Sequence, residues 1–388
     1  MRVIYTGRFG YPTSAAGIRV KEIAKQLSAG GVRVDMLCDT VQPDGEYEAD
    51  NAGIRYSFIQ TAGKGRINFL KQLLDIVFGN KIFRAVISEI EKEKPVAVVL
   101  YNDAYMLTKR LIPYCRKRGI RVVGDVTEWY ERPRMSSLND RLIPFLTDKR
   151  ILYVDRKLDS VISISPYLMS YYANIGVETA FIPPIVTASN MHPPEAHDGL
   201  IHLTYAGSPG EKDLIFPVIN AVSQINELEE KFVMDIYGVT KKDLCIDEIY
   251  KGVIFHGRVD HEEVLKALRM ADFSFLLRRD LRYAKAGFST KFVECMSHGV
   301  AMICNRVGGA DAILTDRVDG ILLNDASQDT LLRILSELSS WNRNQIQSMR
   351  FQAYTTAIRL FSADQYKETI INLILGRQDD KCVCDENR

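Results

Sequence analysis

Segments typical of β-strands and of α-helices alternate along nearly the whole chain, with one interruption at a proline-rich stretch from residue 183 to residue 194. Before that stretch, short apolar runs rich in β-branched residues are separated by segments in which apolar residues recur every three or four positions. This alternation is typical of a doubly wound parallel sheet with helices on both faces. We expect the strands at Val3–Thr6, Val32–Cys38, Val96–Tyr101, Arg121–Val126 and Ser160–Ser163.

The same alternation begins again after the prolines, from Leu200 onward. Because 388 residues are too many for one ordinary core, the sequence predicts two α/β domains. The second set of expected strands is Ile201–Ala206, Phe232–Tyr237, Val253–Phe255, Phe273–Leu277, Val300–Cys304 and Gly320–Leu323. The predicted organisation is a first domain over 1–185, a linker over 186–199, a second domain over 200–355, a helix over 356–376 that could cross back to the first domain, and a polar tail over 377–388.

Composition excludes several classes of function. Hydrophobic residues at 46% and a net charge of +1 indicate a globular protein with no overall attraction to nucleic acid. No run of about 18 apolar residues is present, and the chain opens on a strand rather than on a signal peptide. Seven scattered cysteines favour reduced thiols, so we expect a cytoplasmic protein. Cys382 and Cys384 could bind a metal, but incidental cysteines in a polar tail are the preferred interpretation.

Ligands of open α/β sheets bind outside the carboxyl ends of the strands, so a cleft between two such domains is the expected site. One segment that follows a strand there, residues 287–305, reads GFSTKFVECMSHGVAMICN. Ser289 or Thr290 can cap a helix that ends before Gly299, and the first amides of such a helix attract anions. Lys291 can neutralise a phosphate, and Glu294 can accept hydrogen bonds from two sugar hydroxyls.

An alternative interpretation makes Lys291 and Glu294 a solvated ion pair and Ser289 a simple cap. With Ser289 or Thr290 as the cap, a capping box would need its glutamate three positions later, at 292 or 293. Glu294 occupies neither of these positions. Capping therefore does not explain Glu294, and on this segment alone the two interpretations stay open.

The segment STKFVECMSHGVAMICN resembles the donor-binding helix of retaining GT-B glycosyltransferases of the family 4 type. The resemblance implies two facing Rossmann-like domains. It also implies that Glu294 holds the ribose hydroxyls of a nucleoside diphosphate-sugar and that Lys291 lies near the diphosphate. Further similar segments are LTYAGSPGEKDLI (203–215), DIYG (235–238), VIFHGRVDHEEV (253–264) and YPTSAAGIRVKEIAKQL in the first domain. By this resemblance the donor-binding residues are Gly17, Gly207, Ser208, Lys212, Gly238, Gly257, Arg258, Arg279, Ser289, Thr290, Lys291 and Glu294.

Two positions depart from the family pattern. Ser208 stands where the family usually has an arginine, and Arg278 or Arg279 could supply that charge. Ala286 stands eight positions before Glu294, where many members have a first glutamate that contacts the transferred sugar. We expect Ala286→Glu to be tolerated. A degenerate, non-catalytic relative stays an alternative.

The first domain offers a second candidate region in VVGDVTEWYERPR, residues 122–134. Asp125 and Glu128, beside Trp129 and Tyr130, could grip the hydroxyls and the apolar face of a sugar, although a capped loop explains Asp125 equally well. The candidate catalytic residues are Asp125, Glu128, Lys212 and Lys291, the two lysines stabilising the departing diphosphate. Residues 64–92 form a basic amphipathic segment that could touch an anionic membrane, but a helix packed on the core is the preferred interpretation.

The expected function is transfer of a sugar from a nucleoside diphosphate-sugar to a saccharide or lipid-linked acceptor, in polysaccharide or lipopolysaccharide assembly. The chain contains no Asp-x-Asp pair, so neither a metal nor another cofactor is expected. A nucleotide-sugar epimerase and a non-catalytic sugar-nucleotide-binding protein are the alternatives. A dehydrogenase is disfavoured because the glycines at 7, 10 and 17 do not fit G-x-G-x-x-G.

Overall fold

The computed structural model divides into two compact units, Met1–Ile185 with the chain from Ala363 onward, and Val186–Ser362. It describes residues 1–11, 14–40, 45–50, 53–60, 78–131, 138–195, 199–210 and 212–377. The predicted linker over 186–199 thus lies within the second unit, and the chain returns to the first unit at Ala363, later than the predicted residue 356.

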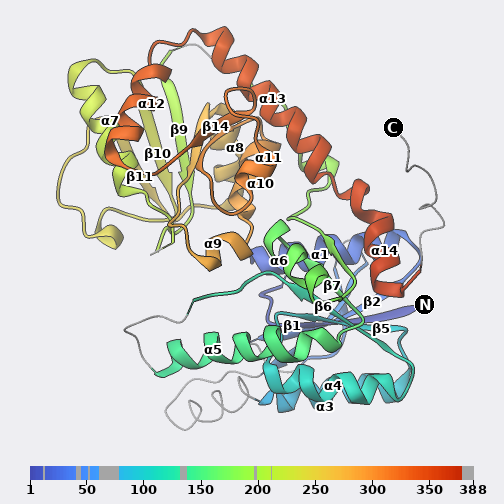
Figure 1. The fold of residues 1–388 in the computed structure, drawn as a ribbon. Coiled ribbons are helices and arrows are strands. Elements are labelled where there is room, and N and C mark those ends of the chain that lie inside the picture. Colours follow the sequence, from blue (N-terminus) through green and yellow to red (C-terminus); the bar gives the residue numbers. More distant parts are fainter. Residues whose placement is uncertain are drawn as a thin grey trace, which may run out of the picture. The chain divides into compact units, whose positions relative to one another are not determined.

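The first unit is built on an eight-stranded sheet with strand order β3-β4-β2-β1-β5-β6-β7-β8, in which only β3 is antiparallel to its neighbour. Helices α1 and α14 pack together on one face of this sheet, and α3 and α4 lie on the other (Figure 1). The strands are β1 (Arg2–Gly7), β2 (Arg33–Thr40), β3 (Glu48–Ala49), β4 (Arg55–Gln60), β5 (Ala97–Tyr101), β6 (Arg121–Val126), β7 (Ser160–Ser163) and β8 (Thr179–Phe181). The helices are α1 (Ala15–Ala29), α3 (Asn80–Lys92), α4 (Tyr105–Arg116), α5 (Leu138–Lys149), α6 (Pro166–Asn174) and α14 (Lys367–Leu375).

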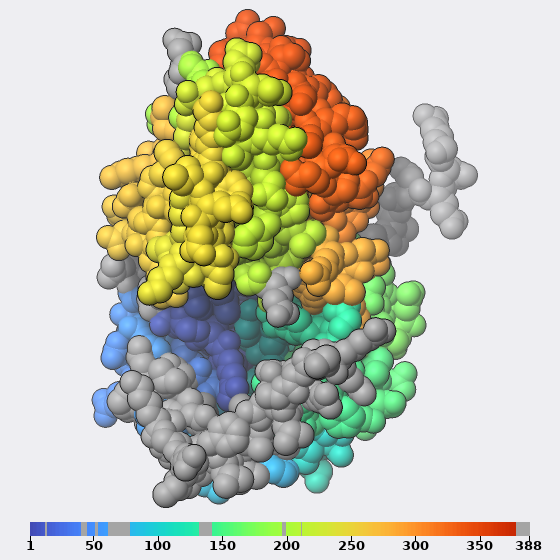
Figure 2. Space-filling view, turned by 90° about the vertical axis from the view of Figure 1, so that its left-hand side faces the viewer, coloured from blue at the N-terminus to red at the C-terminus, as the bar shows by residue number. Residues whose placement is uncertain are grey.

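The second unit is built on a six-stranded, all-parallel sheet with strand order β11-β10-β9-β12-β13-β14. Helices α7 and α12, far apart in sequence, pack side by side, and Figure 2 shows the yellow-green and red segments in contact. The strands are β9 (Ile201–Ala206), β10 (Phe232–Tyr237), β11 (Val253–Gly257), β12 (Phe273–Leu276), β13 (Ala301–Asn305) and β14 (Gly320–Leu323). The helices are α7 (Phe216–Leu228), α8 (His261–Met270), α9 (Arg282–Ala286), α10 (Thr290–Ser297), α11 (Ala310–Ile313), α12 (Gln328–Leu338) and α13 (Arg343–Phe361).

These sheets confirm the predicted fold class, two doubly wound α/β arrangements. All six strands expected in the second unit are present within two residues of their predicted ends. The sequence analysis missed β3, β4 and β8 in the first unit, because these strands, at or next to the edges of the sheet, are exposed or only partly buried and lack a continuous apolar run. Of the predicted basic segment 64–92, residues 64–77 lie outside the described residues, as does the tail with Cys382 and Cys384; the described part contains α3.

Each sheet has one point at which its winding reverses. In the first sheet this switch point lies between β1 and β5, and in the second it lies between β9 and β12. Neighbouring connections leave such a pair of strands in opposite directions, which opens a crevice at their carboxyl ends. The second switch point is where the predicted phosphate-binding helix should be sought.

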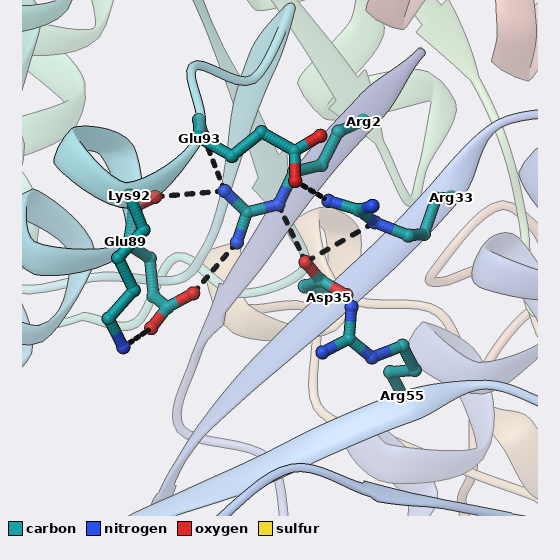
Figure 3. Close-up of polar contacts among 7 residues, drawn as sticks. All are labelled: Arg2, Arg33, Asp35, Arg55, Glu89, Lys92 and Glu93. Carbon is teal, nitrogen blue, oxygen red and sulfur yellow. Dashed lines mark hydrogen bonds and ion pairs between the residues drawn. The ribbon is translucent and has the colours of Figure 1, made fainter.

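A buried ion cluster joins the amino ends of β1 and β2 to helix α3 in the first unit (Figure 3). Arg2 Nε lies 2.6 Å from Asp35 Oδ2, and Arg2 Nη2 lies 2.8 Å from Glu89 Oε2. Arg2 Nη1 also donates to the carbonyl oxygen of Glu89, at 2.8 Å. Arg55 approaches the other oxygen of Asp35, at 3.0 Å. The cluster lies at the amino ends of the strands, away from the edge where ligands of such sheets bind. Its role is to hold β1, β2 and α3 together.

No helix in the described part of the chain is long and apolar enough to cross a membrane.

Candidate functional site

The predicted helix of the second unit is confirmed as α10, which begins at Thr290 and ends at Ser297. Ser289 is its N-cap, and the Ser289 hydroxyl accepts a hydrogen bond from the amide of Phe292 at 3.4 Å. Gly299, with φ of 70°, turns the chain into β13 after the helix. The cap satisfies only one of the first amides, so the other amides of the first turn keep their capacity for an anion.

Lys291, in the first turn of α10, is fixed to the carboxyl end of β9. Its Nζ lies 2.5 Å from Asp213 Oδ2, donates to the hydroxyl of Tyr205 at 2.8 Å, and sits 4.3 Å from the centre of the Tyr205 ring. The Tyr205 hydroxyl in turn donates to Asp213 at 2.9 Å. A side chain at Gly207 would come within 3.2 Å of Lys291 Nζ, so the glycine leaves room for the ammonium. Lys291 therefore lies at the second switch point.

Arg278, directly after Leu277 at the end of β12, is the second cation of this cluster. Its Nε lies 2.9 Å from Asp213 Oδ1. Its backbone is held by the Asn305 side chain, which accepts from the Arg278 amide at 2.9 Å and donates to the Arg278 carbonyl at 2.7 Å. Asp213, from the loop after β9, thus bridges two cations from the connection that follows β12, Lys291 in α10 and Arg278, across the switch point. We call Lys291, Asp213, Arg278 and Tyr205 the Lys291 cluster.

Burial and charge act in opposite directions within the Lys291 cluster. Burial lowers the pKa of the Lys291 ammonium, and Asp213 only partly offsets this effect. Burial raises the pKa of the Asp213 carboxyl, but Lys291 and Arg278 together bring it below its ordinary value. Burial, then the charge of Asp213, raise the pKa of Tyr205. These directions favour an ionised Asp213 and a protonated Tyr205 near neutral pH, and Asp213 favours the charged form of Lys291.

Glu294 lies three residues after Lys291 and is 30% exposed. Its Oε1 is 3.3 Å from Nε2 of His261, the first residue of α8. Burial raises the pKa of the Glu294 carboxyl, and His261 lowers it. A partly exposed carboxylate beside a solvent-accessible histidine keeps acceptor capacity for hydroxyl donors.

Glycines bring the ends of β9, β10 and β11 close together. Gly207 and Gly238 have φ of 136° and 95°, and a side chain at Gly238 would meet the backbone of Gly207 at 2.9 Å. The Gly207 amide donates to the Tyr237 carbonyl at 2.9 Å, and the Gly238 amide donates to the Gly257 carbonyl at 2.6 Å. These strand ends therefore form one backbone floor. The other predicted donor-binding side chains of this unit, exposed in loops after strands or at the start of α10, are Ser208, Lys212, Arg258, Arg279 and Thr290.

In the first unit, the structure places Asp125 in the core. It is fully buried, and its carboxylate accepts hydrogen bonds from Arg19 at 2.9 Å and from the Tyr5 hydroxyl at 2.6 Å. Arg19 also donates to the carbonyl oxygens of Ile182 and Pro183, at 2.9 and 3.0 Å. This environment favours a structural role for Asp125, which holds Arg19 against the backbone of Ile182 and Pro183, over the sugar contact that the sequence predicted.

The neighbours of Asp125 in the sequence include one buried and one exposed candidate residue. Trp129 is buried, donates from its indole nitrogen to Asp148 at 2.8 Å, and packs on the Tyr171 ring. Glu128 is exposed and stays the first-unit candidate for a sugar contact. Gly17, predicted near the donor phosphates, has a packing reason to be glycine, because a side chain there would meet the Gly10 carbonyl at 2.7 Å.

One expectation is corrected by the structure. Ala286 ends the short helix α9 and is fully buried, so a glutamate there would have to bury its carboxylate. The expected tolerance of Ala286→Glu is therefore wrong. The residue was assumed to line an open site because of its spacing from Glu294, and spacing alone did not reveal its burial.

The sequence analysis missed Asp213, Tyr205 and Asn305. Asp213 directly follows Lys212 in the segment quoted above, but nothing in the sequence pairs it with a lysine 78 positions later. Only the strand order, which sets β9 beside β12, brings these side chains together. Within the described residues, no group of three or more histidine, cysteine, aspartate or glutamate side chains is placed to hold a metal.

Comparison with known proteins identifies the second unit. Residues 201–340 match the sequence family described as glycosyl transferases group 1. The matched residues lie within the second unit, Val186–Ser362. An uncharacterized glycosyltransferase of Methanocaldococcus jannaschii is 26% identical over 117 residues, which cover 29% of this chain and 29% of that relative. The chain therefore matches less than a third of this curated relative.

Solved structures extend the similarity to the whole fold. Sucrose-phosphate synthase from Thermosynechococcus elongatus superposes with a TM-score of 0.74 at 15% identity, over 95% of this chain and 97% of that one. WaaG, a glycosyltransferase involved in lipopolysaccharide biosynthesis, gives 0.68 at 13% identity, over 96% and 100%. HepE of Anabaena in complex with UDP and glucose gives 0.65 at 13%, over 95% and 98%. The predicted GT-B fold is thus confirmed. The match of residues 201–340 supports the predicted glycosyltransferase family for the second unit.

Proposed function

We propose that this protein is a retaining glycosyltransferase that moves a sugar from a nucleoside diphosphate-sugar to a saccharide or lipid-linked saccharide acceptor. The observation that carries the proposal is the grouping, in the second unit, of the α10 amides, Lys291 and Glu294 at one switch point. A diphosphate needs positive charge and oriented amides, and a ribose needs an acceptor for its hydroxyls. These chemical groups lie within one helical turn of each other.

The chemistry follows from the same groups. When the bond between the sugar and the diphosphate breaks, negative charge grows on the leaving oxygen. Lys291, Arg278 and the α10 amides, held in position before the reaction, would stabilise that charge without a metal. In a retaining reaction the leaving diphosphate can take the proton of the attacking hydroxyl on the same face of the sugar.

Two relatives narrow the proposed substrates. HepE of Anabaena has been solved with UDP-glucose, and WaaG is involved in lipopolysaccharide biosynthesis. We therefore propose a UDP-sugar as the first donor to test and a surface polysaccharide or lipopolysaccharide as the product. The predicted cytoplasmic location and membrane contact stay predictions.

The proposal is tested by isothermal calorimetry with UDP, GDP, ADP and dTDP on the wild-type protein and on Glu294→Ala. Loss of two hydrogen bonds from ribose hydroxyls to a carboxylate should weaken the preferred nucleotide at least about tenfold. Glu227→Ala, which removes an exposed glutamate from α7 of the same unit, is the matched control and should bind like wild type. Wild-type affinity in Glu294→Ala would remove Glu294 from the site. Turnover of the bound sugar nucleotide, with and without saccharide acceptors, then separates a transferase from an epimerase and from a protein that only binds.

A further inference from the structure

The Lys291 cluster contains a carboxylate where an anion-binding site would not need one. Asp213 is 5% exposed and lies between two cations, 2.5 Å from Lys291 Nζ and 2.9 Å from Arg278 Nε. Each cation keeps binding capacity beyond this contact. Lys291 uses two of its three ammonium protons, for Asp213 and Tyr205, and within the described part of the chain the Arg278 guanidinium is engaged only through Nε.

The two cations are aligned by this one side chain. Lys291 comes from α10 and Arg278 from the end of β12, and Asp213 belongs to the loop after β9, so three separate segments meet at one carboxylate. Without Asp213, the two positive charges would lose the carboxylate that lies between them. The remaining charge of the three groups is +1, beside the positive end of α10.

We infer that Asp213 is a positioning residue that holds Lys291 and Arg278 together as one clamp for the donor diphosphate, and that Arg278 supplies the charge absent at Ser208. This inference rests on the proposed function. It assigns Asp213 no contact with the substrate; the carboxylate acts through the two cations. Arg278, rather than its exposed neighbour Arg279, is the arginine that the structure joins to Lys291.

A purely structural role for Asp213 would give a different pH dependence. The groups that face Lys291 are Tyr205 from β9, Asp213 from the following loop, Arg278 from the end of β12 and Cys295 from α10 itself. Burial and Arg278 lower the pKa of Lys291, and Asp213 opposes them. Replacing Asp213 by asparagine should lower this pKa further, so Lys291 would lose its proton, and the site its grip on the diphosphate, as pH rises.

The experiment measures the dissociation constant of UDP, or of whichever nucleoside diphosphate the wild type binds best, between about pH 6 and pH 9. Asp213→Asn should bind at least about tenfold more weakly near neutral pH, and should weaken further with rising pH in a range where wild type is constant. Adding Lys291→Arg to Asp213→Asn should abolish this pH dependence, because a guanidinium stays charged. Wild-type affinity in Asp213→Asn, or weakening that is equal at every pH, would overturn the inference.

A second pair of variants tests Arg278 even if Asp213→Asn fails to fold. Arg278→Ala should weaken nucleotide binding about tenfold, and Ser208→Arg in that background should restore part of the loss, because position 208 is exposed at the end of β9. If Arg278→Ala binds like wild type, Arg278 is no part of the clamp. If the wild-type protein binds none of the nucleotides, the proposed function fails and the inference fails with it. A functional wild type with insensitive Asp213 and Arg278 variants overturns the inference alone.

Discussion

Two ion clusters of similar composition occupy opposite kinds of position in this protein. The first is the ion cluster of Arg2, Asp35, Glu89 and Arg55 in the first unit, which we call the Arg2 cluster, and the second is the Lys291 cluster. Each places a buried aspartate between cations. The Arg2 cluster lies at the amino ends of β1 and β2, where Arg2 also donates to a peptide carbonyl of α3 (Figure 3). The Lys291 cluster lies at the carboxyl ends of β9 and β12, beside the first turn of α10.

Exposure separates the two clusters as clearly as position does. Arg2 and Asp35 are 5% and 1% exposed, whereas Lys291 and Arg278 are 25% and 15% exposed. At the centre of the Arg2 cluster, Nε and both Nη atoms of Arg2 are bound by protein groups, so Arg2 holds strands and helix together. The rim arginines Arg33 and Arg55 are 42% and 40% exposed. The Lys291 cluster is partly open on the side where ligands of such sheets bind. The comparison teaches that strand direction and residual exposure, rather than the presence of paired charges, distinguish a binding site from a structural cluster.

The largest effect, a loss of stability, should follow from breaking the Arg2 cluster. Arg2→Met leaves Asp35 and Glu89 buried without their main partner, so we expect a loss of about 3–5 kcal/mol in the free energy of unfolding of the first unit. Urea denaturation followed by fluorescence measures this loss. Arg33→Met, which removes a 42% exposed arginine from the rim of the same cluster, is the control and should cost about 0–1 kcal/mol.

The same variant also tests the distinction between the clusters. Folded Arg2→Met protein, measured well below its unfolding transition, should bind nucleoside diphosphate with wild-type affinity. Weakened binding in the folded variant would show that the Arg2 cluster contributes to the site and that the comparison is wrong.

A substitution in the Lys291 cluster should have the opposite effect, weakening binding more than stability. Lys291→Met removes one cation but leaves Asp213 paired with Arg278 at 2.9 Å, so the second unit should lose little stability. Nucleoside diphosphate affinity should fall about 100-fold, since a charge-assisted contact to phosphate is lost from a partly desolvated site. Calorimetry and a thermal melt on the same sample measure both quantities. Strong destabilisation with intact binding would place Lys291 in the same structural class as Arg2.

The sequence predicted the frame of the second unit well and its electrostatics poorly, and the reason is physical. A strand such as β13 (AMICN) is a fully buried run of mostly apolar residues, and the limits of α10 depend on its local cap at Ser289 and on Gly299. Local signals of this kind are written in adjacent residues. The pairing of Lys291 with Asp213 depends on the order of strands in the sheet, which no adjacent residues encode.

In the first unit, too, contacts between distant residues decide what adjacent residues cannot predict. Asp125 follows a strand and stands among acidic and aromatic residues, which predicts a sugar site, but Arg19 and Tyr5 reach it through the core and bury it. Glu128, three residues later, is exposed. The sequence placed both residues in one region correctly and could not tell which of them faces solvent, because that depends on contacts with residues more than a hundred positions away.

The smallest effect should come from Glu294, which lies beside the Lys291 cluster on α10 and 3.3 Å from His261. Burial raises the pKa of Glu294 and the imidazole charge lowers it, so His261→Gln should raise this pKa further. Protonated Glu294 is a poorer acceptor for ribose hydroxyls, so affinity for nucleoside diphosphate in the variant should begin to fall at a higher pH as the solution is acidified. We expect a few-fold weakening at mildly acidic pH and none at alkaline pH, where both proteins have an ionised Glu294. Calorimetry across pH, with His256→Gln as a control on β11, measures the shift. The same pH dependence in His261→Gln and in wild type would contradict the prediction, because His261 would then not shift the pKa of Glu294 in the site.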